Sequence, residues 1–424
     1  MIRYHPLPNR PTIGVFLIFI LVYTEMKRNV ARTANRGPRR VQKVEQKSPI
    51  GVNQQKSPSP SPIVPLRTRV SNKNIPLLQS TKKVMDKERW EFDEKDSATI
   101  AKCVGGVLYR LRKAGALRSI REEFMRTRNY IPQGPKEAFL ANESRNRYRD
   151  VLLLDNTRVV LKNRSSDYIH ASKVMVGSNV FICTQGPLEN TVESFWAMVF
   201  QENVKLIVQL CRFSEEGKEK CYEYLPRNEG IMVFGDFVIE CICRNKLPET
   251  DGATCGLLEV KSRGRKEQVE HILYENWYDH AAPENFNASF ELIQIAKRKR
   301  KNAPVVVHCS AGVGRTGCFV GVELAAHWAA TKKTLQMDLL LKELRDQRMH
   351  SVQTDVQYLY IYRGLIEYLI RKGVTRRLDV SKFVNDYDSL IKRRKTKEQD
   401  KENLSLAVKE GRSKDYCPSV YFIL

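Results

Sequence analysis

Around residues 300–350, the pattern of apolar and polar positions predicts a short strand followed by two helices. Residues Ala303–Val307 form a β-branched run bounded by Pro304, which is typical of a buried strand. Residues Arg315–Ala330 read as a helix, and residues Leu335–Arg348 carry apolar side chains at helical spacing. The residues between the strand and the first helix therefore form a loop at a helix N-terminus.

Three further patterns mark the ends of helices. Asn190 is suited to begin a helix that contains the apolar run at 195–200. Thr354 and Gln357 have the spacing of a capping box at the start of another helix. We interpret the basic run at 297–301 as the solvated end of a helix before the strand, rather than as a nuclear localisation signal.

Charge is distributed unevenly along the 424 residues, which carry a formal net charge of +24. Residues 1–90 hold 18 Lys and Arg against 4 Asp and Glu, and residues 371–424 hold 14 against 8. These surpluses of 14 and 6 leave only +4 for the residues between them. The basic flanks favour contact with an anionic membrane surface or an acidic partner, whereas we expect no specific nucleic acid.

The first 90 residues predict a basic and largely disordered leader. Residues 31–75 are rich in Arg, Lys, Ser, Pro and Asn, a composition that buries too little apolar surface to order itself. Residues Ile13–Tyr23 form an apolar run of eleven residues, which is shorter than the ~20 residues that span a bilayer. We take this run as a candidate for membrane association, with the chain that follows it in the cytoplasm.

The loop after the predicted strand carries the chemistry. Residues 308–317 read His-Cys-Ser-Ala-Gly-Val-Gly-Arg-Thr-Gly, with Cys309 and Arg315 six positions apart. A thiolate can attack phosphorus, and a guanidinium binds two phosphate oxygens at once. At a helix N-terminus, unpaired amides and the macrodipole favour both a bound phosphate and an ionised Cys309. The amides of the loop belong to Ser310, Ala311, Gly312, Val313 and Gly314. A working thiolate also indicates a reducing compartment, the cytosol or the nucleus, and of these we expect the cytoplasm.

Two other interpretations of this loop have less support. Gly312, Gly314 and Gly317 also satisfy the G-x-G-x-x-G pattern of dinucleotide-binding proteins. That fold requires a second buried strand after the helix, whereas residues 335–348 predict another helix. The structural alternative is a buried cysteine that follows a strand by coincidence.

A candidate proton donor lies upstream of Cys309. Residues 277–280 read Trp-Tyr-Asp-His, in a loop-like stretch after an apolar run. Together with Cys309 and Arg315, this segment resembles the tyrosine-specific protein phosphatase family, whose mobile acid loop reads Trp-Pro-Asp. The resemblance implies that Asp279 is the general acid and base and that Trp277 supports the loop.

The chain departs from the family pattern at three positions. Tyr278 stands in place of the proline of the acid loop, and Ala281 stands in place of the usual glycine. Because proline restricts the backbone and tyrosine does not, we expect a working enzyme with a changed rate or pH profile. His170 replaces the usual asparagine of a supporting segment, and we expect this change to affect local stability more than chemistry.

A second resembling segment, Asn146–Asp150, corresponds to the phosphotyrosine-recognition loop of the family. The resemblance implies that Tyr148 packs against the substrate ring and that Asp150 bonds the substrate backbone. An aromatic wall at this depth favours phosphotyrosine over the shorter phosphoserine, which could not reach Cys309.

Further residues receive roles from the same resemblance. Glu215 is expected to pair with Arg315 and orient its guanidinium, while Lys220 is expected to lie near Asp279. The resemblance also implies that Gln353 positions the hydrolytic water and that Gln357 binds substrate. It implies that Thr316 stabilises the departing thiolate and that His308 orients the loop.

The resemblance covers roughly residues 90–370 and implies an α/β domain of the protein-tyrosine-phosphatase fold, a twisted mixed sheet flanked by helices on both faces. We divide the chain into the leader 1–90, one non-receptor-like catalytic domain at 91–370 and a basic tail at 371–424. The implied activity is hydrolysis of phosphotyrosine in proteins through a phosphocysteine, with no metal and no cofactor. The alternative is a catalytically weakened protein that binds phosphotyrosine; a lipid or nucleic-acid phosphatase is suggested only by the basic flanks.

Overall fold

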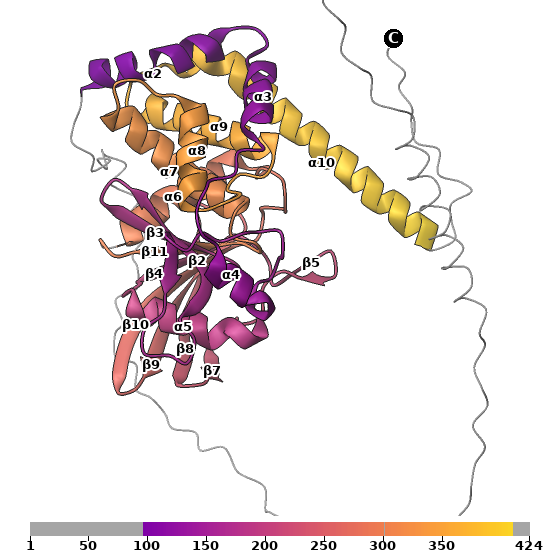
Figure 1. Ribbon diagram of the computed structural model, residues 1–424. Helices are drawn as coiled ribbons and strands as arrows, with labels where there is room; N and C mark the ends of the chain where they lie inside the picture. Colours follow the sequence, from indigo (N-terminus) through magenta and orange to yellow (C-terminus); the bar gives the residue numbers. More distant parts are fainter. Residues whose placement is uncertain (1–95, 301, 410–424) are drawn as a thin grey trace, which may run out of the picture. The chain divides into compact units, whose positions relative to one another are not determined.

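The computed structural model describes residues 96–300 and 302–409, and of residues 397–409 it describes the backbone alone (Figure 1). Its main sheet contains nine strands. Their bounds are β1 Arg158–Val160, β2 Tyr168–Val176, β3 Asn179–Thr184, β4 Leu206–Gln209, β7 Gly230–Phe234, β8 Phe237–Lys246, β9 Ala253–Ser262, β10 Arg265–Tyr274 and β11 Val305–His308. A separate hairpin consists of β5 Ser214–Glu215 and β6 Lys218–Glu219.

The helices lie before, between and after these strands. Their bounds are α2 Ser97–Arg112, α3 Ala116–Thr127, α4 Glu137–Ala141, α5 Val192–Gln201, α6 Phe286–Lys299, α7 Arg315–Thr331, α8 Met337–Gln347, α9 Asp355–Arg371 and α10 Ser381–Lys409. Short 3-10 helices occupy Glu143–Arg145, Glu189–Thr191 and Arg377–Val380.

The centre of the main sheet is parallel and its two ends are antiparallel. The strand order is β1-β2-β3-β11-β4-β10-β9-β8-β7, and β3, β11, β4 and β10 pair in parallel. Val306 of β11 lies between Ile182 of β3 and Ile207 of β4, and all three side chains are fully buried. Such continuous burial is typical of parallel strands that helices cover on both faces. The loop that follows β11 therefore starts from the middle of the sheet.

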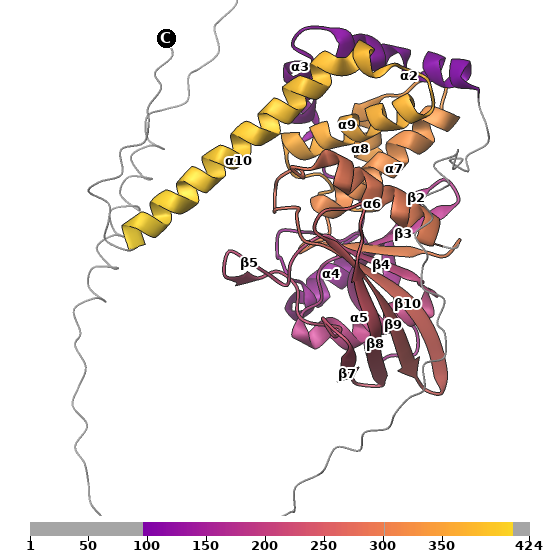
Figure 2. The ribbon, with the colours of Figure 1, turned by 180° about the vertical axis from the view of Figure 1, so that it is seen from behind.

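Helices cover both faces of this sheet. Figures 1 and 2 view the molecule from opposite sides, and α5 lies in front of the strands in the first view and behind them in the second. On the other face, α7 packs against β11, β2 and β3. This twisted mixed sheet between two layers of helices confirms the predicted α/β fold.

The strand and helices predicted around the loop are present. β11 spans Val305–His308, α7 spans Arg315–Thr331 and α8 spans Met337–Gln347. α6 ends in a basic turn at Lys299, as the interpretation of that run as a helix end requires. The capping box predicted at Thr354 and Gln357 begins α9.

The predicted helix start at Asn190 is displaced. The turn there is the 3-10 helix Glu189–Thr191, and the Thr191 hydroxyl accepts the Leu188 N–H at 2.9 Å. The Asn190 amide instead donates to the Ser144 carbonyl at 3.0 Å. A contact with a segment distant in sequence has thus replaced the local cap that the sequence predicted.

The packed part of the chain extends beyond the predicted boundary at residue 370. Helix α10 packs against α2, α3 and α9, and it buries Phe383, Val384, Tyr387 and Ile391. These residues recur at helical spacing and form one apolar face. The first part of the segment assigned to the basic tail therefore belongs to the same core as the strands.

Within residues 96–300 and 302–409, no helix is both long and apolar enough to cross a membrane. The sequence predicted a cytoplasmic chain with membrane association through the apolar run at 13–23. The finding corrects this prediction, since no described helix offers the about 20 apolar residues that a membrane span needs. That run and the rest of the leader at 1–90 lie outside the described residues.

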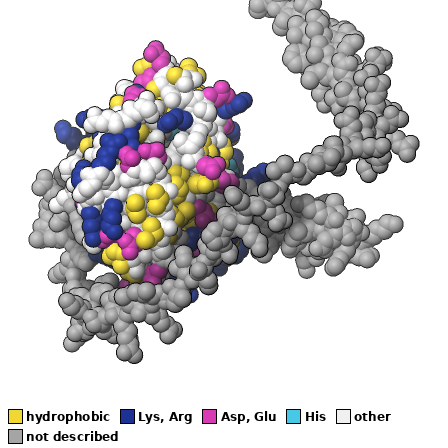
Figure 3. All heavy atoms as spheres, turned by 90° about the horizontal axis from the view of Figure 1, so that it is seen from below, with side chains coloured by type: hydrophobic (Ala, Val, Ile, Leu, Met, Phe, Trp, Pro, Cys, Tyr) yellow, Lys and Arg dark blue, Asp and Glu magenta, His cyan; other side chains and the backbone are white. Residues whose placement is uncertain are grey.

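The face of the molecule seen from below carries charges of both signs. Figure 3 shows Lys and Arg groups next to Asp and Glu groups, with hydrophobic side chains between them. This mixture agrees with the small surplus of +4 that lies between the two basic flanks of the sequence. The strong positive charge of the chain therefore belongs to its flanks.

Candidate active site

The loop between β11 and α7 forms the floor of the site. Cys309 is 2% exposed, and its Sγ accepts the Gly312 N–H at 3.3 Å. Gly312 has φ +69°, and a Cβ atom there would lie 2.0 Å from the Thr184 carbonyl oxygen. Only glycine fits this position, because both the left-handed backbone and the close approach exclude a side chain. The glycine therefore allows the loop to turn its N–H groups toward the sulfur at the start of α7.

A buried arginine, Arg348, fixes the other side of the loop. Its Nε donates to the Gly312 carbonyl and its Nη2 donates to the Ala311 carbonyl, both at 3.1 Å. Because the carbonyl groups face Arg348, the opposite side of the loop presents its N–H groups. Nothing in the local sequence marks this residue, which is the last position of a predicted helix.

His170 supports Arg348, although the sequence placed the stability of this position in doubt. The His170 Nε2 donates to the Val151 carbonyl at 2.8 Å, and its Nδ1 accepts from Arg348 Nη2 at 3.1 Å. Burial, together with the charge of Arg348, lowers the pKa of His170 to about 3, so the ring is neutral at physiological pH. Both ring nitrogens are satisfied, and the histidine therefore fits this position.

Arg315 begins α7 and is fully buried above the loop. Its Nη1 and Nη2 donate to the two Glu215 oxygens at 2.6 and 3.1 Å, which is the pairing that the sequence predicted. Nη1 also donates to the Trp277 carbonyl at 2.9 Å. The Nε atom is buried and has no hydrogen-bond partner among the described residues. Burial opposes the charge of Arg315, but Cys309 and Glu215 outweigh it and raise its pKa. The guanidinium is thus a fixed cation with a donor left for an anion.

Asp279 lies between two cations. Its Oδ2 is 2.9 Å from Lys220 Nζ and its Oδ1 is 3.3 Å from Arg315 Nη2. Burial raises the pKa of Asp279, yet the charge of Arg315 and the hydrogen bond from Lys220 outweigh this effect and lower it. The same bond outweighs burial at Lys220 and raises its pKa. The predicted proximity of Lys220 to Asp279 is present, and the arrangement favours the carboxylate form.

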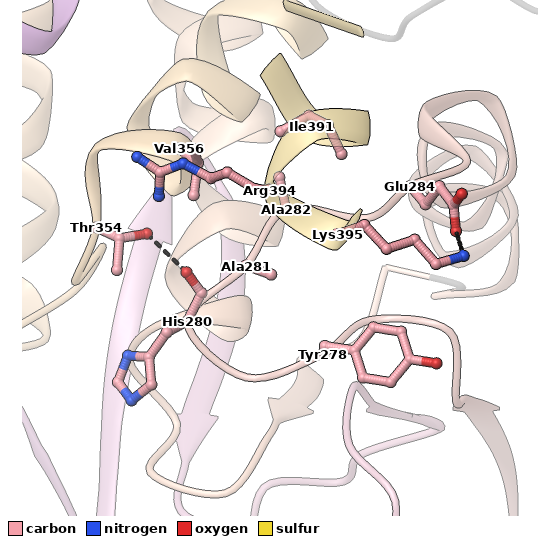
Figure 4. A pocket seen from close by; sticks show the side chains of 10 residues that line it. All are labelled: Tyr278, His280, Ala281, Ala282, Glu284, Thr354, Val356, Ile391, Arg394 and Lys395. Carbon is pink, nitrogen blue, oxygen red and sulfur yellow. Dashed lines mark hydrogen bonds and ion pairs between the residues drawn. The ribbon is translucent and has the colours of Figure 1, made fainter. Parts of the chain in front are cut away.

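The segment that carries Asp279 is held by one hydrogen bond within itself and by another to the residue before α9. Trp277 is buried, and its indole N–H donates to the Ala281 carbonyl at 2.9 Å. The Thr354 hydroxyl donates to the His280 carbonyl at 2.9 Å. Behind this acid loop, residues 277–284, lies a pocket of about 360 Å³ that is bounded by the start of α9 and by α10 (Figure 4).

Tyr148 borders the loop on another side. Its hydroxyl lies 2.8 Å from the Ser310 Oγ, which in turn donates to the Lys220 carbonyl at 3.0 Å. The Tyr148 ring is partly exposed, and Asp150 is exposed next to it. An aromatic ring therefore stands beside the loop between β11 and α7, two residues before an exposed carboxylate.

The two glutamines of the predicted set have different surroundings. The Gln357 Oε1 accepts the N–H groups of Gln353 and Thr354 at 2.8 and 3.2 Å, so it caps α9. A Cβ at Gly314 would lie 2.5 Å from Gln353 Oε1, which places the Gln353 amide directly against the loop between β11 and α7. Gln353 is thus in reach of the site. The Gln357 oxygen is used structurally, but its Nε2 lies 2.9 Å from the same Cβ and has no hydrogen-bond partner among the described residues.

The two remaining predicted residues are fully buried. The Thr316 hydroxyl has no hydrogen-bond partner among the described residues. The His308 Nε2 lies 2.8 Å from the Tyr224 hydroxyl, and its Nδ1 lies 3.2 Å from the Cys309 carbonyl. Burial lowers the pKa of His308 to about 4. A neutral His308 therefore orients the Cys309 backbone through the partner Tyr224, which sequence analysis did not identify.

Known proteins share this combination of residues. The sequence pattern described as protein-tyrosine phosphatase matches residues 142–367, more than half of the chain. Mouse tyrosine-protein phosphatase non-receptor type 9 is 33% identical over 282 residues, which cover 61% of this chain and 47% of that protein. Rat tyrosine-protein phosphatase non-receptor type 21 is 37% identical over 253 residues, which cover 54% of this chain and 21% of that protein. The chain thus spans less than half the length of these curated relatives.

A solved structure is also similar in fold. It is described as "Structural basis of PTPN18 fingerprint on distinct HER2 tyrosine phosphorylation sites". The two chains are 29% identical with a TM-score of 0.52, and the match covers 54% of this chain and 84% of that one.

Proposed function

The chain belongs to the protein-tyrosine phosphatase family, and on this premise we propose that it hydrolyses phosphotyrosine in proteins through a phosphocysteine at Cys309. The main support is the buried Arg315 Nε, which has no partner among the described residues, close to a cysteine whose Sγ accepts a loop N–H. A buried donor without a partner is costly, and a phosphate oxygen would satisfy it. Asp279, 3.3 Å from the same guanidinium, supplies the proton-transfer group.

In the first step, the Cys309 thiolate attacks phosphorus while the bond from phosphorus to the tyrosyl oxygen breaks. Arg315 and the loop amides stabilise the charge on the equatorial oxygens. Asp279 gives its proton to the leaving phenolate. The dianionic phosphate competes with Asp279 for Arg315 Nη2, and loss of that ion pair raises the pKa of Asp279. Substrate binding therefore favours the protonated form that the step requires.

In the second step, water attacks the phosphocysteine. The Asp279 carboxylate accepts a proton from this water, and Gln353 holds the water against the loop. The sulfur–phosphorus bond breaks, inorganic phosphate leaves and the Cys309 thiolate returns. The Thr316 hydroxyl, which has no hydrogen-bond partner within the described part of the chain, donates to the departing sulfur. Atoms and charge balance over the two steps, with water as the only other reactant.

The substrate class follows from the wall of the site. Tyr148 stands beside Ser310, where its ring can pack against the ring of a phosphotyrosine, and Asp150 at the rim can accept a hydrogen bond from the substrate backbone. Cys309 is 2% exposed, so a shorter phosphoserine would not reach it. We therefore expect phosphotyrosine-containing proteins as partners; an acidic partner of the basic flanks stays an expectation from the sequence.

Replacement of Asp279 by asparagine tests the proposed function. We expect kcat/KM for a phosphotyrosyl peptide to fall roughly 10²- to 10⁴-fold, the usual contribution of a general acid. The basic limb of the pH profile should also disappear, because the group that must carry a proton is gone. Steady-state kinetics of the full chain from pH 4 to 8 measure both effects. The alternative function, phosphotyrosine binding without hydrolysis, predicts that even the unmodified protein releases no phosphate.

A change at Lys220 shifts the pH profile in a defined direction. Lys220 stabilises the Asp279 carboxylate through its bond at 2.9 Å, so Lys220→Met should raise the pKa of Asp279. Because an acid catalyst stays protonated up to its pKa, the basic limb of kcat/KM should move to higher pH. Lys218→Met removes the same charge from an exposed position of the same hairpin and should leave the limb in place. A shift to lower pH would contradict the proposed role of Asp279.

A further inference from the structure

Tyr278, the residue in place of the family proline, contacts a side chain outside its own loop. Its side chain is 55% exposed, yet the Arg212 guanidinium lies over its ring at 5.7 Å from the centroid. Arg212 follows β4 and precedes the β5–β6 hairpin. An arginine over a tyrosine ring at this distance is an attractive cation–π contact. The contact therefore connects the acid loop to the hairpin.

The segment between β4 and the hairpin, which carries Arg212, is itself bound to Glu215 and through it to Arg315. The Arg212 N–H donates to Glu215 Oε1 at 3.1 Å, and the same oxygen accepts from Arg315 Nη1 at 2.6 Å. At the other end of the hairpin, Lys220 holds Asp279 at 2.9 Å. Glu215 thus fixes the backbone of Arg212 relative to Arg315.

Three successive residues of the acid loop are contacted from this side. The Trp277 carbonyl accepts from Arg315, the Tyr278 ring lies under Arg212, and the Asp279 carboxylate pairs with Lys220. Figure 4 shows Tyr278 at the edge of the pocket behind the acid loop, while Lys395 of α10 reaches past it to Glu284.

We propose that Tyr278 is a positioning residue for Asp279, and that its stacking with Arg212 holds the acid loop over the nucleophile in place of the backbone restriction of a proline. The contact ties the residue next to the acid to a hairpin that Glu215 aligns with Arg315. The ring, not the hydroxyl, makes the contact, because the guanidinium lies over its face. This inference rests on the proposed function, in which Asp279 protonates the leaving phenolate.

The size of the effect follows from the exposure of the contact. A cation–π pair at an exposed site changes an equilibrium about two- to fivefold. If the pair holds the loop, its loss should lower kcat/KM about two- to fivefold only where the leaving group needs a proton. A tyrosyl phenol, with a pKa of about 10, needs one, whereas a dinitrophenolate leaves as the anion. The dependence on the leaving group therefore separates positioning of the acid from general damage.

The test compares kcat/KM of full-length variants on a phosphotyrosyl peptide and on dinitrophenyl phosphate. Tyr278→Ala and Arg212→Ala should each lower the peptide value about two- to fivefold and leave the dinitrophenyl value unchanged. Tyr278→Phe should retain the activity, and the double alanine variant should be no worse than either single variant. Tyr109→Ala is the matched control, because Tyr109 is an exposed tyrosine with Lys113 4.0 Å from its ring centroid, on helix α2.

The Asp279→Asn variant distinguishes failure of the inference about Tyr278 from failure of the proposed function. If it shows strong leaving-group dependence while Tyr278→Ala lowers both substrates equally or neither, Tyr278 does not position the acid, and the proposed function stands. If Asp279→Asn lowers both substrates equally, Asp279 is not the acid, and the roles of both residues are overturned. Additive losses in the Tyr278→Ala/Arg212→Ala double variant would also overturn the proposed contact.

Discussion

Replacement of Cys309 by serine should abolish turnover while leaving phosphopeptide binding intact. A neutral hydroxyl is a far weaker nucleophile than a thiolate, and loss of a catalytic nucleophile costs on the order of 10⁶ in rate. The anion-binding groups of the site, Arg315 and the loop amides, are untouched by this change. Removal of the negative sulfur also relieves its repulsion of the phosphate, so affinity should not fall. An assay of phosphate release measures turnover, and titration with a phosphotyrosyl peptide measures binding.

A second buried cysteine provides the control for this experiment. Cys183 lies on β3, next to β11, and burial raises the pKa of its thiol to about 12. A thiol held neutral in this way is inert, so Cys183→Ser should keep normal turnover once thermal unfolding shows that it is folded. Acid quenching with labelled substrate should trap phosphate on the wild type and not on Cys309→Ser. Turnover by Cys309→Ser near the wild-type rate would overturn the phosphocysteine mechanism.

The part of the fold around the nucleophile loop was predictable from local sequence. The burial of β11 and α8 is predictable because the apolar residues of each element recur at spacings of only a few positions. The glycine pattern at 312, 314 and 317 was ambiguous between phosphate and dinucleotide binding until the following helix was considered. The resemblance then supplied Asp279 and Glu215, whose contacts with Arg315 the structure contains.

The supports of the loop were not predictable in the same way. Arg348 binds the loop 37 positions away and His170 178 positions away. A basic residue at the end of an amphipathic helix is ordinarily explained by the helix dipole, so nothing local marks Arg348 as buried. Its role depends on which distant carbonyl groups the fold brings to it, and that information lies in the tertiary structure.

The C-terminal boundary of the packed domain was placed too early for a different reason. The basic composition of residues 371–424 favoured a solvated tail, yet Phe383, Tyr387 and Ile391 are spaced four apart and pack as one face of α10. Periodicity carried the structural signal here, whereas average charge concealed it. In an amphipathic helix, charged residues on the exposed face are compatible with a buried apolar stripe.

Replacement of Arg315 by lysine should be nearly as damaging as loss of the nucleophile. Lysine keeps the positive charge but lacks the planar fork and the Nε donor, which has no hydrogen-bond partner among the described residues. An arginine that stabilises phosphoryl transfer contributes roughly 10³ to 10⁵ in rate, and we expect kcat/KM to fall by that amount. Binding of a phosphotyrosyl peptide to Arg315→Lys should weaken as well, which separates this variant from Cys309→Ser.

Loss of stability must be distinguished from loss of transition-state binding in this variant. Arg315 is fully buried against Glu215, and breaking a buried pair costs about 3–5 kcal/mol of unfolding free energy. Lysine preserves the charge opposite Glu215, whereas alanine would leave that carboxylate unpaired. Arg363→Lys is the matched control, because Arg363 is buried on α9 and pairs with a carboxylate of the same helix, Glu367, at 3.3 Å. If both lysine variants unfold at the same denaturant concentration and only Arg315→Lys loses activity, the guanidinium acts on the phosphate. If the two lose activity equally, the proposed clamp is wrong.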